Sequence, residues 1–351
     1  VGGIRGVSAS SDAITVANDG TCTANVTNNL SNRNKIINGA MTVSQRGTSF
    51  TSDGLTLDRF ERQESTDGAY TVTQSTTSPD GFSNSLKVDV TTADTSLSAA
   101  QYANLKYKIE AQDLQDLAFG TSAAKTVVLS FYVRSNKTGN YAFAIQQSDN
   151  SFKLASFQYT INSADTWERK TIVIAGDTSG VINNDNGDGF ILLWAFAAGS
   201  NYTTGSLRST FTTRVAADQY AGQGVNLLDS TSNEWYITGV QLEVDHTGSG
   251  VATDFEHRSF AQELALCQRY YVKGRNRLTF NGVSGRYNFT TIGRHNMRAA
   301  PTVTGSFASQ GLGSVEGYGS DSTNDLRQIY VQTTVGSGLD GTITYEATAD
   351  L

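Results

Sequence analysis

A series of short segments, each alternating apolar and polar residues, runs from residue 33 to about residue 260 and constrains the fold most strongly. A period of two places successive side chains on opposite faces, as in a half-buried β-strand. Gly, Asn, Asp and Ser cluster between the segments, where turns are expected. The expected strands are IINGAMTV, DGAYTVTQS, SLKVDVTT, YANLKYKIE, KTVVLSFYVRS, NYAFAIQQS, FKLASFQYTI, ERKTIVIAG, GFILLWAFAA and WYITGVQLEV.

So many strands without alternating helices predict a mostly β fold, an antiparallel jelly-roll β-sandwich rather than a parallel α/β sheet. The presence of only 2 Pro excludes a proline-rich linker or a collagen-like stalk. DLQDLAFG is expected to form a helical turn. SFAQELALCQRYY predicts a short connecting helix, with Ser259 as N-cap and with Phe260, Leu264 and Cys267 on one face.

Three units are expected along the 351 residues: an extended N-terminal stalk or attachment segment (1–32), the sandwich (33–260), and the connecting helix with a small C-terminal β domain (261–351). In the first unit, two alternating runs flank Asn18-Asp19-Gly20, which indicates a hairpin or a stalk segment that pairs with other chains. The last unit contains the expected strands RLTFNGVSGRYNFTTIG (two runs with turns at Asn281-Gly282 and Ser284-Gly285), PTVTGSFAS, LRQIYVQTTVG and TITYEATADL. Because the chain does not begin with Met, we expect it to be part of a longer protein.

Eight motifs follow one another along the chain: NRNKIINGAMTVSQRGTSF, LDRFE, SPDGFSNSLKVDVTTADTSL, VVLSFYVRSNKTGNY, WERKTIVIAGDTSG, VNLLDSTSNEWYITGVQLEV, VATDFEHRSF and ELALCQRYY. In this order they resemble a domain of tail-fibre and related receptor-binding proteins of tailed bacteriophages, notably phages of cyanobacteria and marine bacteria. The resemblance covers roughly residues 30 to 271, and one departure is Asp254, where the family usually has proline. The opening and closing strands also resemble those of jelly-roll carbohydrate-binding modules.

This resemblance implies a tail-fibre receptor-binding protein, without enzymatic activity, in the tail of the virion. It would recognise a host cell-surface glycan, such as a lipopolysaccharide, during adsorption. Two other functions stay open: a structural virion protein (capsid decoration, head fibre or tail adaptor) and a glycan depolymerase. Because such fibres are usually three-fold, a parallel homotrimer is expected, with the N-terminal segment contacting other tail proteins.

Charge and composition exclude several other partners. The net charge is −7 and no basic run is present, which argues against nucleic acid and also disfavours an anionic polysaccharide. No apolar run is long enough to cross a membrane, so no insertion is expected. Cys22 and Cys267 lie far apart in the sequence and are expected to be free thiols.

No catalytic residue, metal site or cofactor is expected from the residues. His257 in FEHRSF has no G-x-S-x-G or comparable nucleophile pattern nearby, so it is interpreted as a hydrogen-bonded loop residue. The acidic residues are scattered rather than paired. The segment from Asn184 to Gly189 resembles the start of a calcium loop, but Ala195 stands where an EF-hand has its bidentate Glu, so a turn is expected.

Sugar binding is expected in the longest polar loop region, from Ala197 to Gln223, because loops carry polar contacts and aromatic faces stack on sugar rings. The alternative interpretation is that Phe211 and Tyr220 anchor this loop to the sandwich. The candidate ligand-binding residues are Tyr202, Arg208, Arg214 and Tyr220.

Two further groups of residues are given structural roles. The tryptophans are expected in the core or between the sheets. The arginines of the family-like motifs are expected to fix loops by pairing with acids or aromatic rings. These residues are Trp167, Trp194 and Trp235, and Arg46, Arg59 and Arg258.

Overall fold

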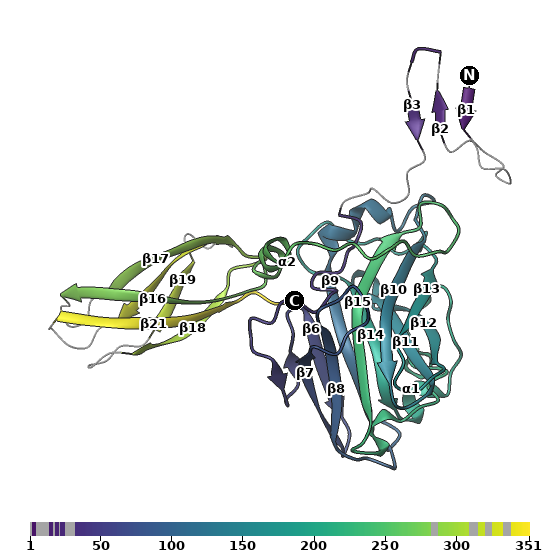
Figure 1. Ribbon diagram of the computed structural model, residues 1–351, viewed down its shortest axis with the longest axis horizontal. Helices are drawn as coiled ribbons and strands as arrows, with labels where there is room; N and C mark the ends of the chain where they lie inside the picture. The colour runs from purple at the N-terminus through teal and green to yellow at the C-terminus, as the bar shows by residue number, and fades with distance from the viewer. Residues whose placement is uncertain are drawn as a thin grey trace.

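The computed structural model describes residues 2–4, 14–16, 18–20, 22–24, 32–281, 287–308, 315–319, 325–332 and 338–351. A β-sandwich of two six-stranded sheets forms the largest part, and three smaller three-stranded sheets lie outside it (Figure 1). The predicted fold, mostly β and built on an antiparallel sandwich with a connecting helix and further C-terminal strands, is therefore confirmed.

Both sheets of the sandwich are antiparallel throughout their described pairings. The first sheet has the order β13 (Glu168–Ile174), β10 (Val127–Ser135), β15 (Glu234–Val244), β8 (Ser85–Thr92), β7 (Ala69–Ser75) and β4 (Ser49–Phe50). The second sheet has the order β12 (Lys153–Ile161), β11 (Gly139–Gln147), β14 (Asp188–Ala198), β9 (Tyr102–Glu110), β6 (Phe60–Ser65) and β5 (Gly54–Leu55). Nine of the ten strands expected in the sandwich are present as β7 to β15.

Short helical segments join these strands. The expected turn at DLQDLAFG is the 3-10 helix η1 (Ala111–Leu117). The others are η2 (Ser148–Asn150), α1 (Ser200–Thr203), η3 (Ala216–Asp218) and η4 (Leu227–Asp229). Among the described residues, no helix is long and apolar enough to cross a membrane.

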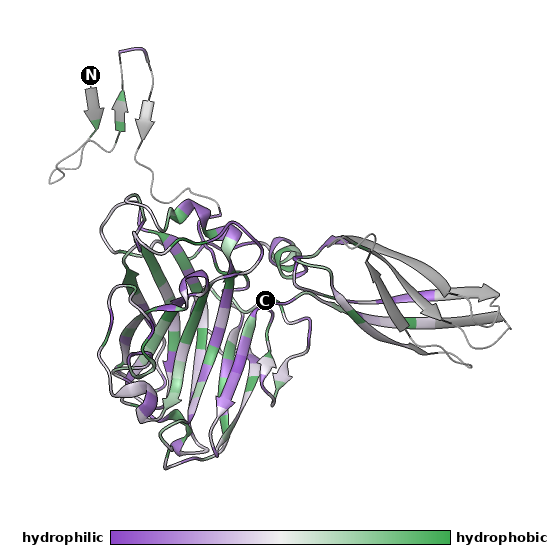
Figure 2. Ribbon diagram, turned by 180° about the vertical axis from the view of Figure 1, so that it is seen from behind, coloured by the Kyte–Doolittle hydropathy of each residue, from purple (hydrophilic) through white to green (hydrophobic). Residues whose placement is uncertain are grey.

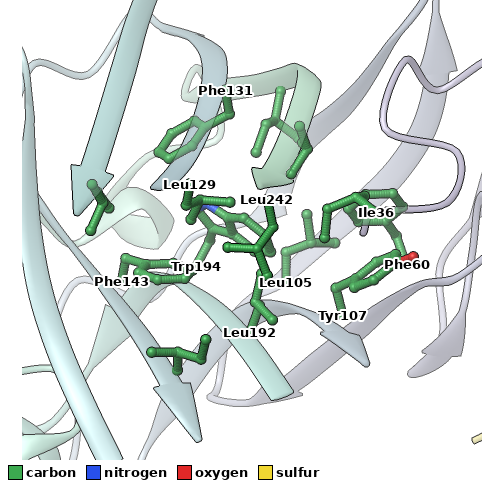
Figure 3. Close-up of a cluster of buried hydrophobic side chains, with 14 of the residues drawn as sticks. Ile36, Phe60, Leu105, Tyr107, Leu129, Phe131, Phe143, Leu192, Trp194 and Leu242 are labelled. Carbon is green, nitrogen blue, oxygen red and sulfur yellow. The ribbon is translucent and has the colours of Figure 1, made fainter. Parts of the chain in front are cut away.

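The core lies between the two sheets, where the inward residues of each strand meet (Figure 3). Trp194 of the second sheet is fully buried and meets Phe131 of the first sheet edge to face, with ring centroids 6.0 Å apart. Trp235 is also fully buried. The expectation for Trp167 is wrong: it precedes β13, is only half-buried, and lies on the outer face against Tyr236.

IINGAMTV, expected to be the first strand, instead forms a turn. Asn38 and Met41 have positive φ angles of 61° and 57°, which an extended strand cannot contain. The Asn38 side chain holds this turn by bonding both the N–H and the carbonyl of Val43. Gly39 packs so closely on β15 that a Cβ would lie 2.2 Å from the carbonyl oxygen of Val240. The apolar and polar alternation therefore misled the prediction.

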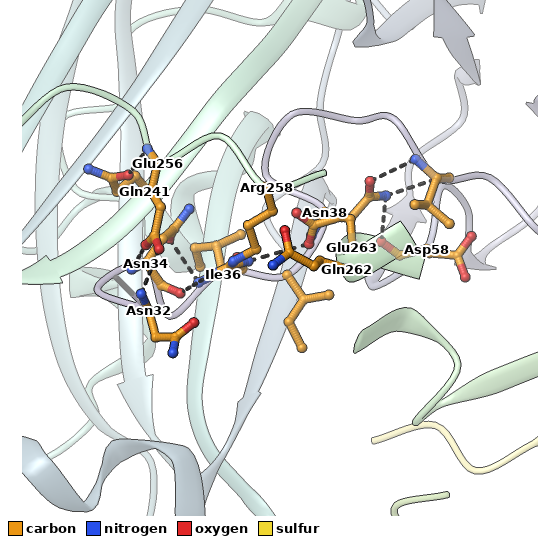
Figure 4. Close-up of polar contacts among 12 residues, drawn as sticks. Asn32, Asn34, Ile36, Asn38, Asp58, Gln241, Glu256, Arg258, Gln262 and Glu263 are labelled. Atoms are coloured by element: carbon orange, nitrogen blue, oxygen red, sulfur yellow. Dashed lines mark hydrogen bonds and ion pairs between the residues drawn. The ribbon is translucent and has the colours of Figure 1, made fainter. Parts of the chain in front are cut away.

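The residues of the FEHRSF motif tie this opening segment to the end of the sandwich (Figure 4). The Glu256 carboxylate accepts the backbone N–H groups of Asn32 and Asn34, at 2.6 and 2.8 Å. The Arg258 guanidinium donates to the carbonyls of Asn34 and Ile36. We call this set of contacts the clasp, and Arg258 has the structural role expected of it.

The clasp continues into α2 (Phe260–Cys267) through Glu263. The side chain of Glu263 is buried, accepts the backbone N–H of Asn38 at 2.5 Å, and lies 3.4 Å from Arg258. His257 belongs to the same motif but is exposed, with its ring against Phe82.

Replacing Glu263 by alanine is expected to lower the free energy of unfolding by about 2 kcal/mol, because the buried N–H of Asn38 loses its acceptor. Glu263→Gln keeps an acceptor oxygen and is expected to cost less. Urea unfolding followed by the fluorescence of the buried Trp194 and Trp235 measures both. A Glu263→Ala variant as stable as the parent would contradict a stabilising role for the clasp.

Helix α2 begins as predicted, because Ser259 and Gln262 form a capping box. The predicted apolar face is only partly correct. Cys267 is buried and is a free thiol, whereas Phe260 is 59% exposed. The buried residues of α2 are Glu263 and Cys267. Glu263 points inward because its carboxylate accepts the backbone N–H of Asn38. The side chain of Cys22 lies outside the described residues.

The C-terminal strands form two three-stranded antiparallel sheets that extend away from the sandwich beyond α2 (Figures 1 and 2). The orders are β16-β21-β18 and β17-β20-β19. The predicted strands are confirmed, and β19 was missed; the predicted turns at 281–285 lie almost wholly outside the described residues. The strands are β16 (Tyr271–Asn281), β17 (Tyr287–Asn296), β18 (Thr302–Ala308), β19 (Val315–Gly319), β20 (Asp325–Gln332) and β21 (Gly338–Thr348).

Ionic contacts join the C-terminal strands to the sandwich. The guanidinium of Arg269, directly after α2, donates to both carboxylate oxygens of Glu110 at 2.8 Å each. Arg46 pairs with Asp350 at 2.5 Å and lies over the ring of Tyr271. Arg46 therefore has the structural role expected of it, and it acts at this junction.

Arg59 also packs at the junction, with its guanidinium 3.4 Å from the ring centroid of Tyr270.

At the other end of the chain, β2 (Ile14–Val16) and β3 (Cys22–Ala24) pair antiparallel around residues 18–20, so a hairpin forms there; pairing of this segment with other chains stays a prediction. The strand β1 (Gly2–Ile4) pairs with β2.

Candidate functional site

The outer face of the second sheet is hollowed where β6, β9 and β14 run side by side. Along β9, Leu105 points into the core. The alternating residues Tyr102, Asn104 and Lys106 therefore point outward. The strand register places Gln63 of β6 directly opposite Asn104, so the two amide side chains share one row of the sheet.

An apolar floor lies beside this polar row. It is made by Ile191 and Leu193, which project outward from β14. Gln146 of β11 lies opposite Ile191 and forms the other side. Together these side chains line a groove of about 240 Å³.

The polar segment between β14 and η4 folds back over the end of this sheet. Its backbone bonds to β12, where Leu154 and Thr212 exchange N–H to carbonyl bonds in both directions. Phe211 inserts into the core against Phe119 and Phe190, with centroids 5.7 and 6.0 Å away. The anchoring interpretation of Phe211 is thus confirmed, and the segment forms a fixed wall of the groove.

Three tyrosines close one end of the groove. The rings of Tyr102 and Tyr202 meet edge to face at 5.5 Å, and Tyr202 and Tyr220 lie 6.3 Å apart. Tyr220 is fully buried and anchors the segment, whereas Tyr102 and Tyr202 are partly exposed. Tyrosine hydroxyls are protonated at neutral pH, and burial raises the pKa of Tyr102 and of Tyr220 further above the ordinary 10. Aromatic surfaces of this kind can stack on a sugar ring.

A chain of side-chain hydrogen bonds forms the opposite polar edge. Gln219 accepts from Gln146 at 3.2 Å and from Arg214 at 3.1 Å through the same oxygen. Gln146 and Gln219 are buried, so they hold the exposed guanidinium of Arg214 at the rim.

One buried oxygen in the groove wall lacks a hydrogen-bond partner among the described residues: Asn104 Oδ1. Asn104 is only 1% exposed. An unpaired buried polar atom costs about 1–3 kcal/mol. Several others lie elsewhere among the described residues, as at Trp194 Nε1 in the core, but Asn104 is the one that also lines the groove. Asn104 lines the groove, but its Oδ1 is covered, so a ligand hydroxyl can supply the missing bond only when the Asn104 side chain turns toward the groove.

The structure brings three of the four predicted site residues together. Tyr202, Arg214 and Tyr220 line the groove. Arg208 does not, because its Nε donates to Asp218 at 2.8 Å. The hydrogen bond from the Ser206 N–H, followed by the bond from Arg208, lowers the pKa of Asp218. The pair of Arg208 and Asp218 is thus an internal contact of the segment between β14 and η4.

The strand half of the groove was missed. Its signal was present in YANLKYKIE, where Tyr102, Asn104 and Lys106 recur on the polar face. Alternation of this kind is normal for any sheet with one solvated face, so it cannot mark a binding site by itself. Only the fold shows that the segment with Tyr202 packs against this face.

Two other candidate sites are occupied by internal contacts. A hollow of about 270 Å³ lies under the loop after β15, but the Glu243 carboxylate there already accepts from the N–H and the hydroxyl of Thr253. In the calcium-like loop, Asp185 accepts the N–H of Gly187, and Asn186 donates to Arg298. The described residues contain no group of three or more His, Cys, Asp or Glu placed to hold a metal ion.

No family model and no curated protein matches the sequence. Similar solved structures include the enzymatically active domain of tailspike protein 4 of bacteriophage CBA120, with a TM-score of 0.34 and 12% identity, over 60% of this chain and 21% of that one. The chain thus spans about a fifth of that tailspike structure.

Two carbohydrate-binding modules of Clostridium thermocellum are also similar. The family 11 module of a cellulosomal cellulase has a TM-score of 0.29 and 13% identity, over 56% of this chain and 94% of that one. The C-terminal family 22 module of Xyn10B has a TM-score of 0.29 and 13% identity, over 58% and 98%. At these values the likenesses are to a broad β-sandwich architecture.

Proposed function

We propose that this chain is the receptor-binding part of a phage tail fibre, located in the virion tail, and that its groove binds a glycan of the host cell surface during adsorption. The observation that carries the glycan-binding proposal is the buried, unpaired Asn104 Oδ1 in the wall of a groove with an apolar floor and a tyrosine end. Sugars present this combination, with hydroxyls that donate hydrogen bonds and ring faces that stack on aromatics.

The proposed activity is binding without catalysis. A glycoside hydrolase needs two carboxyl groups flanking the scissile bond. Among the described residues that line the groove, none is Asp, Glu or His. Incubation with the bound polysaccharide is therefore expected to release no new reducing ends and no acyl groups; either product would contradict a purely binding role.

The position in the virion rests on the ordered motifs that resemble tail-fibre proteins, from NRNKIINGAMTV to ELALCQRYY. The test is competition: purified protein is added to host cells, and phage adsorption is then counted. We expect the protein to reduce adsorption. Binding to no host strain, together with density on the head or at the tail hub in virion images, would favour the decoration or adaptor function instead.

We further propose a parallel homotrimer whose N-terminal segment joins other tail proteins. The sheet β1–β3 has strands of three residues and leaves Ile4 68% and Val16 44% exposed. Within the described residues β1 and β3 each pair on one side only, so copies of the chain can add to these edges. Three linked groove sites would raise the overall affinity through avidity.

Light scattering on the chain of residues 1–351 tests the trimer. The expected mass is three times 37.6 kDa, about 113 kDa. A monomer at micromolar concentration that still competes with the phage as well as the intact fibre does would contradict both the trimer and the avidity.

A further inference from the structure

The charges in the groove are opposite in sign to the charge of the whole chain. The chain carries a formal net charge of −7. Of the described residues that line the groove, the charged ones are Lys106 and Arg214, and both are positive. A local patch of this kind decides which ligand charge is attracted at short range, because the field of distant charges is screened by salt.

The two cations differ in how far they are neutralised. Lys106 Nζ lies 2.6 Å from a carboxylate oxygen of Glu61, so much of its charge is compensated. Arg214 bonds instead to the neutral amide of Gln219, through Nη2. Among the described residues it has no carboxylate partner, although acidic neighbours such as Asp218 are used elsewhere in the same segment.

The guanidinium of Arg214 is also oriented. Gln219 and Gln146 are both more than nine-tenths buried and are bonded to each other, so the amide that holds Arg214 cannot turn freely. One edge of the guanidinium is engaged by Gln219, which leaves further N–H donors for a ligand. A guanidinium binds the two oxygens of a carboxylate or a phosphate with parallel hydrogen bonds, which an ammonium group cannot match.

We propose that the glycan bound in the groove is anionic, and that Arg214, assisted by Lys106, binds its carboxylate, phosphate or sulfate group. This inference rests on the proposed glycan-binding function of the groove. The sugar ring that carries the anionic group lies against Tyr102 and Tyr202, and one of its hydroxyls donates to Asn104 Oδ1. The negative net charge of the chain repels polyanions that do not fit the groove, and this repulsion limits non-specific binding.

The experiment uses an array of bacterial capsule and lipopolysaccharide oligosaccharides probed with the chain of residues 1–351. Each uronate-bearing oligosaccharide is paired with its carboxyl-reduced neutral counterpart, and phosphate- and sulfate-bearing members are included to separate the possible sources of charge. We expect binding to acidic members, at least about tenfold weaker binding to their neutral counterparts, and a similar loss in Arg214→Gln. Binding is also expected to weaken as salt is raised.

Arg134→Gln is the matched control, because it removes the same charge from the outer face of the other sheet, where Arg134 pairs with Asp165. It is expected to leave binding unchanged. Equal binding to acidic and neutral partners, or no effect of Arg214→Gln, overturns the anionic ligand but leaves glycan binding intact. Binding to no glycan at all, or binding that is insensitive to Asn104→Leu, overturns the groove function itself.

Discussion

Replacing Arg269 by methionine is expected to lower the free energy of unfolding of the sandwich by about 3–5 kcal/mol, since removing one partner of a buried pair leaves an uncompensated charge. Glu110 is completely buried, and Arg269 is its bidentate partner. Methionine keeps most of the aliphatic length, so the loss reports on the charge and its hydrogen bonds. Urea unfolding followed by tryptophan fluorescence measures the difference.

Two variants separate the buried charge from other effects. Arg134→Met breaks an exposed pair in which Asp165 is 58% exposed, and it is expected to cost less than about 1 kcal/mol. Adding Glu110→Gln to Arg269→Met removes the orphaned charge and is expected to recover part of the stability. If Arg269→Met costs no more than Arg134→Met, the junction does not depend on the pair.

The same pair predicts a dependence on pH. Burial raises the pKa of Glu110 and is the largest single influence on it. The hydrogen bonds from Arg269, Tyr270 and Gln112, together with the charge of Arg269, outweigh burial and lower the pKa below the ordinary 4.5. A carboxyl with a lowered folded pKa stabilises the protein above its unfolded pKa, and this contribution is lost as the pH falls through the folded pKa. The deficit of Arg269→Met is therefore expected to be full at pH 7 and to shrink below about pH 4.5.

The strands were predictable because each combines alternation with turn residues at its ends, as in SLKVDVTT and β8. The opening segment failed for a physical reason. Its backbone bonds to β15, as in Lys35 N–H to the carbonyl of Leu242, but Asn38 and Met41 take left-handed conformations. The pair Asn38-Gly39 is a turn signal, which the prediction passed over in favour of the alternation. The start of α2 was predictable from neighbouring residues, because Ser259 and Gln262 form the capping box. The burial of Glu263 was not, because it depends on a contact with Asn38, which is 225 residues away.

The candidate site was half predictable. Tyr202 and Tyr220 stand out because they are aromatic residues in a long polar segment. Asn104 does not stand out, since an Asn on the polar face of a strand is ordinary until the neighbouring wall buries it. Arg208 and Arg214 look equivalent in sequence. Only the packing shows that Arg208 pairs with Asp218, whereas Arg214 bonds to Gln219 and lies at the groove.

Replacing Asn104 by leucine is expected to change stability and binding in opposite directions. Leucine has a similar branched shape and removes the unpaired Oδ1, so the free energy of unfolding is expected to rise by about 1 kcal/mol. The ligand hydroxyl that would donate to Oδ1 loses its acceptor, so glycan affinity is expected to fall about tenfold or more. Urea unfolding and equilibrium binding to the array glycans measure the two quantities.

The matched control is Lys87→Leu on the outer face of the first sheet, where Lys87 pairs with Glu234. It is expected to leave glycan affinity unchanged. A site that gains stability when it loses function is typical of binding surfaces, because polar groups are kept there for the ligand rather than for the fold. If Asn104→Leu lowers stability and leaves binding intact, Asn104 serves the fold alone.

The most direct test of the groove as a glycan-binding site is hydrogen–deuterium exchange of the chain with and without the bound polysaccharide. Protection is expected on β9 and β14 and in the segment from Tyr202 to Tyr220, on the outer face of the second sheet. Protection confined to the first sheet or to the C-terminal strands, at polysaccharide concentrations that saturate binding, would contradict the account.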